Sequence, residues 1–158
     1  MDAEPPRRTS RSVSVQADGV RSPVALSRLA TLCVTVLRAL KVNNAMLSVT
    51  FVSNKRMAAL NRNHLGHHGP TDVITFALGT DPSGVIVADI YICLDVARRQ
   101  AHEHGVGVRE EIARLVVHGT LHACGWDHPI DDARTTSLMW KRQEQLLRRL
   151  WIAPTLRP

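Results

Sequence analysis

Apolar positions in the first third of the chain recur with two different periods. Across residues 23–41 they return every three or four residues, which predicts an amphipathic helix whose apolar stripe faces a core. Before this helix, the alternation of Val13 and Val15 predicts a short strand, and residues 45–53 have the composition of a second strand. The chain therefore begins with the pattern strand, helix, strand.

The rest of the chain continues to alternate between the two periods. The predicted elements are a helix capped by Ser53 and ended by Gly66, strands at 73–78 and 85–94 joined by a short loop, a helix capped by Asp95 that runs to His104, a helix over 109–124 and a basic helix over 131–150. Because strands and helices interleave around one short hairpin, we expect an α+β fold, with a small mixed β-sheet packed by helices.

Length and composition limit the possible classes of protein. The 158 residues, 44% of them apolar, suit one domain over residues 11–150 with a disordered tail at 1–10 and a second tail at 151–158. The net charge of +6 suits a polyanionic partner such as RNA. Three distant cysteines, no apolar leader and no apolar run of membrane-spanning length together predict a cytoplasmic protein without a membrane segment.

Three histidines stand close together in the stretch HGTLHACGWDH at residues 118–128. His118 and His122 share one face of the predicted helix, and Gly125 can end that helix and turn His128 back toward them. Zinc is the preferred ion because neutral imidazoles suit it, although nickel, cobalt and copper also accept three nitrogens. A site with three protein ligands keeps one position for water, whose pKa falls toward ~7, so the pattern predicts a catalytic metal.

The residue after the first histidine of this stretch bears on whether the metal site is that of a protease. The same histidine spacing occurs in metzincin proteases, which place a glutamate at this position as general base. Here the position is Gly119, so peptide hydrolysis is disfavoured, and a helical glycine predicts close packing or substrate access. Cys124 lies on a different side of the helix from the histidines and is interpreted as a packing residue.

The histidine stretch and two further segments resemble one known family. HGTLHACGWDH is similar to the H-G-x-L-H-x-x-G-Y-D-H signature of the YbeY family, and the stretches PTDVITF at 70–76 and ADIYICLDVARRQAHEHG at 88–105 resemble two of its other conserved segments. The similarity extends from about residue 12 to 149. The family consists of bacterial metal-dependent endoribonucleases of rRNA maturation.

The resemblance implies both a ligand set and an activity. The family's three zinc ligands fall on His118, His122 and His128, with one zinc per chain, and the aspartate of the signature falls on Asp127. The expected activity is cleavage of single-stranded RNA in rRNA maturation and ribosome quality control, with the small ribosomal subunit as partner.

One departure from the family pattern concerns phosphate binding. The family's arginine falls on Leu65, so we predict that Arg62, one helical turn earlier on the same face, binds the substrate phosphate. The alternative is that a histidine of the following loop supplies a weaker charge; these are His64, His67 and His68. Loss of the arginine also keeps open a non-catalytic ribosome assembly factor with structural zinc.

Several other charged residues have two possible interpretations. Asp72 and Asp89 are candidates for accepting hydrogen bonds from the ligand histidines, and Glu111 for orienting a ligand, acting as base or forming a buried salt bridge. Arg148 and Arg149 suit either RNA phosphates or an ordinary solvated face. Because aromatic residues are few, we expect RNA binding to be weak, dependent on salt and insensitive to sequence.

Overall fold

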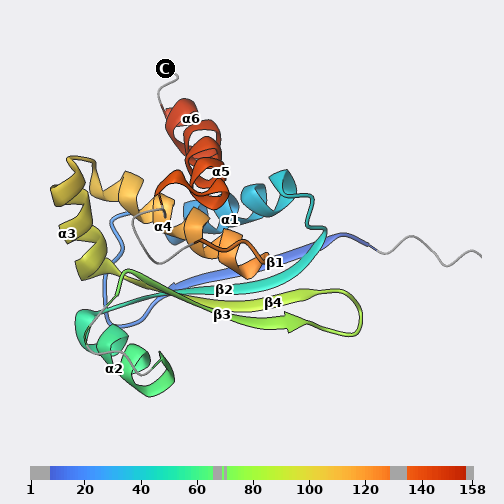
Figure 1. Ribbon diagram of the computed structural model, residues 1–158, viewed down its shortest axis with the longest axis horizontal. Coiled ribbons are helices and arrows are strands. Elements are labelled where there is room, and N and C mark those ends of the chain that lie inside the picture. Colours follow the sequence, from blue (N-terminus) through green and yellow to red (C-terminus); the bar gives the residue numbers. More distant parts are fainter. Residues whose placement is uncertain (1–7, 66–68, 70, 129–134, 156–158) are drawn as a thin grey trace, which may run out of the picture.

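The computed structural model describes residues 8–65, 69, 71–128 and 135–155, and it shows strands and helices in alternation (Figure 1). The elements in chain order are β1 (Ser10–Ala17), α1 (Leu26–Ala39), β2 (Asn44–Val52), α2 (Asn54–Leu65), β3 (Val73–Thr80), β4 (Ile86–Cys93), α3 (Leu94–His104), α4 (Val108–Ala123), α5 (Leu138–Leu147), the π-helical turn η2 (Arg148–Ile152) and the short α6 (Ala153–Thr155).

The four strands form one mixed sheet in the order β1-β2-β4-β3. β1 pairs with β2 and β2 with β4 in parallel, whereas β3 pairs with β4 in antiparallel orientation as the predicted hairpin. The connection from β1 to β2 runs through α1, as parallel neighbours require. The predicted α+β fold is therefore confirmed, and β3 becomes an edge strand.

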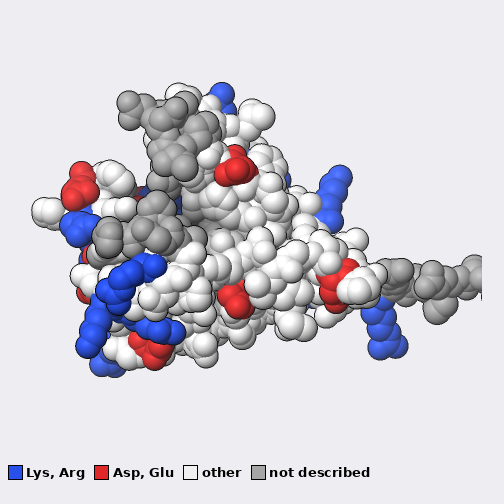
Figure 2. Space-filling view, turned by 60° about the horizontal axis from the view of Figure 1, so that its bottom comes forward, with Lys and Arg blue, Asp and Glu red and all other residues white. Residues whose placement is uncertain are grey.

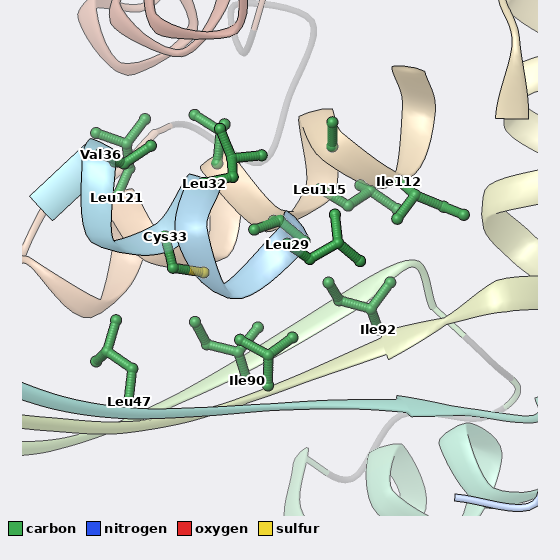
Figure 3. Close-up of a cluster of buried hydrophobic side chains, with 14 of the residues drawn as sticks. Leu29, Leu32, Cys33, Val36, Leu47, Ile90, Ile92, Ile112, Leu115 and Leu121 are labelled. Carbon is green, nitrogen blue, oxygen red and sulfur yellow. The ribbon is translucent and has the colours of Figure 1, made fainter. Parts of the chain in front are cut away.

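Helices α1 and α4 cover one face of the sheet and enclose the main core (Figure 3). Leu29 and Cys33 of α1 and Leu121 of α4 are fully buried above Ile90 and Leu47 of the central strands. Removing one such leucine or isoleucine side chain from water stabilises the fold by about 1.5 to 3 kcal/mol. The core thus holds α4, which carries His118 and His122, firmly against the sheet.

The opposite face of the sheet is covered in part by α2 (Figure 1). Met57 and Leu60 of α2 form a second cluster with Ile74 of β3 and Val96 of α3. Farther along this face Met46 is 57% exposed. The molecule therefore has three layers, helix, sheet and helix, only where α2 covers this face of the sheet.

Two predicted helix starts are wrong. The first helix begins at Leu26 instead of Pro23, because the Ser22 hydroxyl bonds to the backbone of Val24 and forms a turn there. Asp95 does not cap α3, which starts one residue earlier at Leu94. Its carboxylate instead accepts the backbone N–H of Asn54 at 3.1 Å, so it stabilises the start of α2. The predicted Ser53 cap is confirmed by a bond from the Arg56 N–H at 3.2 Å.

The ends of the chain are packed more extensively than the predicted tails. β1 already begins at Ser10, and Trp151 is 8% exposed, with Arg28 stacked 4.6 Å from the centre of its ring. The remaining parts of both tails, at 1–7 and 156–158, lie outside the described residues, as does the predicted start of the last helix at 131–134. Within the described residues that helix starts at Leu138 and is capped by Ser137.

None of the helices in the described part of the chain has the length and apolar character needed to cross a membrane.

Candidate metal centre

The C-terminal half of α4 presents two histidines on one face. His118 and His122 are one helical turn apart, with ring centres 4.6 Å apart and rings nearly perpendicular at 80°. His118 is 4% exposed and His122 is half-buried. Burying an imidazole at the end of an apolar helix is unfavourable unless its nitrogens are bound, so the arrangement calls for partners on both nitrogens of His118.

The chain reverses immediately after α4 through a glycine. Gly125 has φ +93°, in the left-handed region, and its N–H bonds to the His122 carbonyl while the Trp126 N–H bonds to the Leu121 carbonyl. This pair of bonds is the Schellman ending of a helix, which favours glycine at that position. The predicted turn at Gly125 is therefore confirmed.

This turn brings His128 back to the histidines of α4. Its ring centre lies 5.1 Å from that of His118 and 5.0 Å from that of His122. The three side chains offer one nitrogen each, all within 4.8 Å of one another. Three imidazole nitrogens at this spacing match the donors that zinc and similar ions accept, so the triad fits a metal ion.

Hydrogen bonds on the outer nitrogens determine which nitrogen faces the centre. His122 Nδ1 lies 3.0 Å from the Trp126 carbonyl oxygen, and His118 Nδ1 lies 2.6 Å from the Gln143 side-chain oxygen Oε1. A carbonyl oxygen accepts hydrogen bonds, so each Nδ1 carries the proton and donates it. Each Nε2 is then unprotonated, which is the tautomer that a metal ligand needs.

The triad opens into a cavity of about 530 Å³ between α4 and the edge strand β3. Thr75 of β3 lines it, and its hydroxyl donates to the Gly119 carbonyl at 3.5 Å. A Cβ atom on Gly119 would lie 2.7 Å from Cγ2 of Ile90, closer than such atoms approach. Close packing of α4 on the sheet therefore explains this glycine.

Asp72 and Asp89, two of the predicted carboxylates, lie in different parts of the fold. Asp72 lines the cavity, and its oxygens accept the Val73 N–H at 2.8 Å and the Gln100 amide at 3.3 Å. Asp89 is bonded to the Ser48 hydroxyl at 2.7 Å and alternates with the inward Ile90, so it lies on the opposite face of the sheet. The prediction that Asp89 lines the cleft is wrong for this reason.

Of the three roles considered for Glu111, the structure shows the buried salt bridge. It is 2% exposed and lies 3.0 Å from Arg114, which also contacts Glu110 at 3.3 Å and Glu144 at 3.1 Å. Burial alone would lower the pKa of Arg114, but the bonds to Glu144 and Glu111 outweigh it and raise that pKa. Arg114 is therefore a permanent cation among three carboxylates, which we call the Arg114 cluster.

Cys124 follows α4 but is not a member of the triad. Burial raises the pKa of its thiol to about 11, which keeps it protonated at neutral pH. It packs against the main core, as predicted.

The predicted phosphate-binding residues lie away from α4 in the fold. Arg62 is exposed on α2, which packs on the opposite face of the sheet, and its role stays a prediction. His64 stacks edge-on against Phe76 of β3 at 5.4 Å. His67 and His68, together with the Leu65 side chain, lie outside the described residues.

The sequence interpretation missed Gln143 as a partner of the site. It lies on α5, 25 residues after His118, and is 1% exposed. Its signal in the sequence is a polar residue on an otherwise apolar stripe, four residues after Met139 and three before Leu146.

Comparison with known proteins places this arrangement in a family. The family model described as endoribonuclease YbeY matches residues 15–151. The chain belongs to the YbeY family. An endoribonuclease YbeY from Frankia casuarinae is 39% identical over 149 residues, covering 86% of this chain and 73% of the relative, and one from Geobacillus thermodenitrificans is 36% identical over 115 residues, covering 66% and 72%.

A solved structure of another protein has a similar fold. The solution structure of a Thermotoga maritima protein superposes with a TM-score of 0.61 at 26% identity, covering 90% of this chain and 91% of that protein. The YbeY match includes the three histidines and all of β2, β3 and β4, but only the last three residues of β1.

Proposed function

We propose that this YbeY-family chain is a zinc-dependent endoribonuclease that cleaves single-stranded RNA in rRNA maturation and ribosome quality control. The observation that carries the proposal is the triad of His118, His122 and His128, whose nitrogens converge at the floor of an open cavity. The names of the relatives supply the substrate class, since they are endoribonucleases.

The residues of the chain would hold the ion and leave room for RNA. Nε2 of His118 and Nε2 of His122 are directed by their outer hydrogen bonds, and His128 closes the set from the loop. When bound, a divalent ion supplies Lewis-acid stabilisation of developing negative charge and lowers the pKa of a water. The cavity wall formed by Thr75 and neighbouring residues of β3 would limit which part of the RNA reaches the triad.

Packing around Gly119 argues against a peptidase. A metzincin would need a carboxylate at this position, but a side chain here would collide with Ile90, which is fully buried. The described part of the chain thus has no space for that base at this point of α4.

The surface charge suits an RNA backbone. Figure 2 shows Lys and Arg gathered at the end of the molecule where Figure 1 places α2 and α3. The exposed basic residues of these two helices are Lys55, Arg56, Arg62, Arg98 and Arg99. We propose that Arg62, exposed on α2, binds a phosphate of the RNA, because a guanidinium matches phosphate oxygens with a planar fork of donors.

The proposed setting is the cytoplasm, with rRNA of the small ribosomal subunit as the natural substrate. A net charge of +6 supports association with RNA, and association with ribosomes would concentrate a weakly binding enzyme on it. This part of the proposal rests on the family and on charge.

The direct test is cleavage by zinc-loaded protein of a labelled single-stranded RNA, with duplex RNA and casein as competing substrates. We expect cleavage of the single strand alone. His118→Ala should abolish both zinc binding and cleavage, whereas His102→Ala, at an exposed position on α3, should change neither.

The same assay separates the alternatives. Cleavage of casein but not RNA would indicate a peptidase, and zinc binding with no cleavage of either substrate would indicate an assembly factor with structural zinc. Arg62→Ala should weaken RNA cleavage with zinc content unchanged, and Leu65→Arg should restore it in that background; normal cleavage by Arg62→Ala would remove Arg62 from the site.

A further inference from the structure

Gln143 is a buried amide whose position no packing argument requires. It is 1% exposed on α5, between the fully buried Met139 and Leu146. An amide in such surroundings must form hydrogen bonds, because leaving its polar atoms unpaired costs about 1 to 3 kcal/mol. Its partners are His118 of the triad on one side and Glu144 on the other.

The two ends of this amide have different possible roles. If its NH₂ group faced His118, it would donate to Nδ1, and the proton of the ring would then sit on Nε2, where no metal can bind. If its oxygen faces His118, Nδ1 donates and Nε2 carries no proton. The direction of the Gln143 amide therefore decides whether His118 is a ligand.

The charge on Glu144 decides the direction. Nε2 of Gln143 lies 3.4 Å from Oε2 of Glu144, and a carboxylate accepts hydrogen bonds without donating them. The NH₂ group must consequently face Glu144, which leaves the oxygen 2.6 Å from His118 Nδ1.

Glu144 is itself held in place by the Arg114 cluster. Nε of Arg114 lies 3.1 Å from both oxygens of Glu144, and its Nη1 lies 3.0 Å from Oε2 of Glu111, which is nearly fully buried. Because the guanidinium fork is planar and charged, it holds the Glu144 carboxylate in a fixed orientation.

We propose that Gln143 is a positioning residue that holds His118 in the Nδ1–H tautomer with Nε2 toward the metal, and that the Arg114 cluster sets the direction of its amide. The hydrogen bonds converge on Glu144: Arg114 donates to its carboxylate from one side, and His118 donates to Gln143, which donates to that carboxylate from the other. The inference concerns metal binding by the triad, so it rests on the proposed metal site but not on RNA as substrate.

The neutral amide also has a consequence for the ligand. A carboxylate in its place would attract the Nδ1 proton more strongly and make Nε2 a stronger donor to the ion. The structure thus assigns this chain a ligand that is oriented by a neutral group, with the negative charge one residue farther away, on Glu144.

The test reads the tautomer directly in metal-free, ¹⁵N-labelled protein, by ¹H–¹⁵N spectra of the histidine rings at about pH 8.5, above the ordinary histidine pKa of ~6.5. In wild type we expect His118 as the Nδ1–H tautomer. In Gln143→Met, which keeps the shape but removes the acceptor, His118 should move to the Nε2–H tautomer. His122 should remain Nδ1–H in both, because its acceptor is a backbone carbonyl.

Zinc affinity, measured by competition with a chelator, provides a second readout. It should fall about 10- to 100-fold in Gln143→Met. The matched control is Gln145→Met, an exposed glutamine on the same helix, which should change neither readout. Gln143→Glu should keep the Nδ1–H tautomer and bind zinc at least as tightly as wild type.

Glu144→Gln tests the outer part of the arrangement while keeping Gln143, the residue that contacts His118. A glutamine at 144 can donate as well as accept, so a mixture of His118 tautomers and a smaller loss of affinity are expected. An Nε2–H His118 in wild type, or unchanged tautomer and affinity in Gln143→Met, would overturn the proposal. Because RNA cleavage is not measured, failure of the proposed activity would leave these results intact, and the reverse also holds.

Discussion

Gly119→Ala is expected to destabilise the protein although alanine is the better helix former. In the middle of a helix this change ordinarily stabilises by about 1 kcal/mol. Here the added Cβ would lie 2.7 Å from Cγ2 of Ile90, a residue that the core holds fully buried, while its approaches to Ile90 Cδ1 and Thr75 Oγ1, both 3.5 Å, are ordinary contacts.

The magnitude follows from the difference between two opposing effects. Forcing an extra methyl group into a packed core costs about 1 to 3 kcal/mol, so subtracting the helix preference leaves a net loss of about 0 to 2 kcal/mol. In a chain of this size each kcal/mol lowers Tm by about 2 to 4 °C. The free energy of unfolding should be measured by urea titration of metal-free protein, with an unchanged m-value showing that the loss is one of stability.

A second substitution identifies the colliding atom. Ile90→Leu removes the Cγ2 methyl at nearly constant volume, so the double variant should be more stable than the sum of the single changes by roughly 1 kcal/mol. The control is Gly107→Ala, which precedes α4 and has open space around it; its effect should simply add to that of Ile90→Leu. A Gly119→Ala protein about 1 kcal/mol more stable than wild type would show that Ile90 does not obstruct a side chain at this position.

Two other predictions concern buried ionisable groups. Burial raises the pKa of Cys33 from 9.0 to about 11, partly offset by its bond to Thr120. The free energy of unfolding should therefore keep its full value below pH 9 and lose about 2 to 3 kcal/mol as pH rises through 11, because the buried thiol resists ionisation. Urea titrations from pH 8 to 11 should show a smaller decline of this free energy in Cys33→Ala. Arg114→Met should lower the free energy of unfolding by about 3 to 5 kcal/mol, because it leaves Glu111 buried without its cation. Arg99→Met removes an ion pair with Glu103 whose side chains are 60% and 59% exposed, so it should cost under 1 kcal/mol in the same measurement. Equal losses in the two variants would show that burial does not decide the strength of these ion pairs.

Local rules predicted the parts of the site that are close in sequence. His118 and His122 follow from helical spacing, and Gly125 with His128 from the requirements of a helix ending, because these depend on a few neighbouring residues. The same holds for the hairpin of β3 and β4. Helix capping was less predictable, since the Asp95 carboxylate stabilises α2, 41 residues earlier, instead of its own helix.

Contacts between distant segments were beyond the reach of local patterns. Gln143 meets His118 across 25 residues because α5 packs beside α4, and no periodicity indicates which polar residue on an apolar stripe faces a ligand. Asp89 was misplaced for a related reason: its face of the sheet depends on whether Ile90 packs under α4, which is a property of the assembled core.

Stepwise reloading of metal-free protein with zinc tests whether one ion on the histidine triad serves RNA cleavage. Zinc per chain and the rate of cleavage of a single-stranded RNA should be measured in each sample. We expect cleavage to rise in proportion to bound zinc and to level off at about one ion per chain, with no rise in His118→Ala. Full cleavage by protein carrying less than about a tenth of an ion per chain would contradict this expectation.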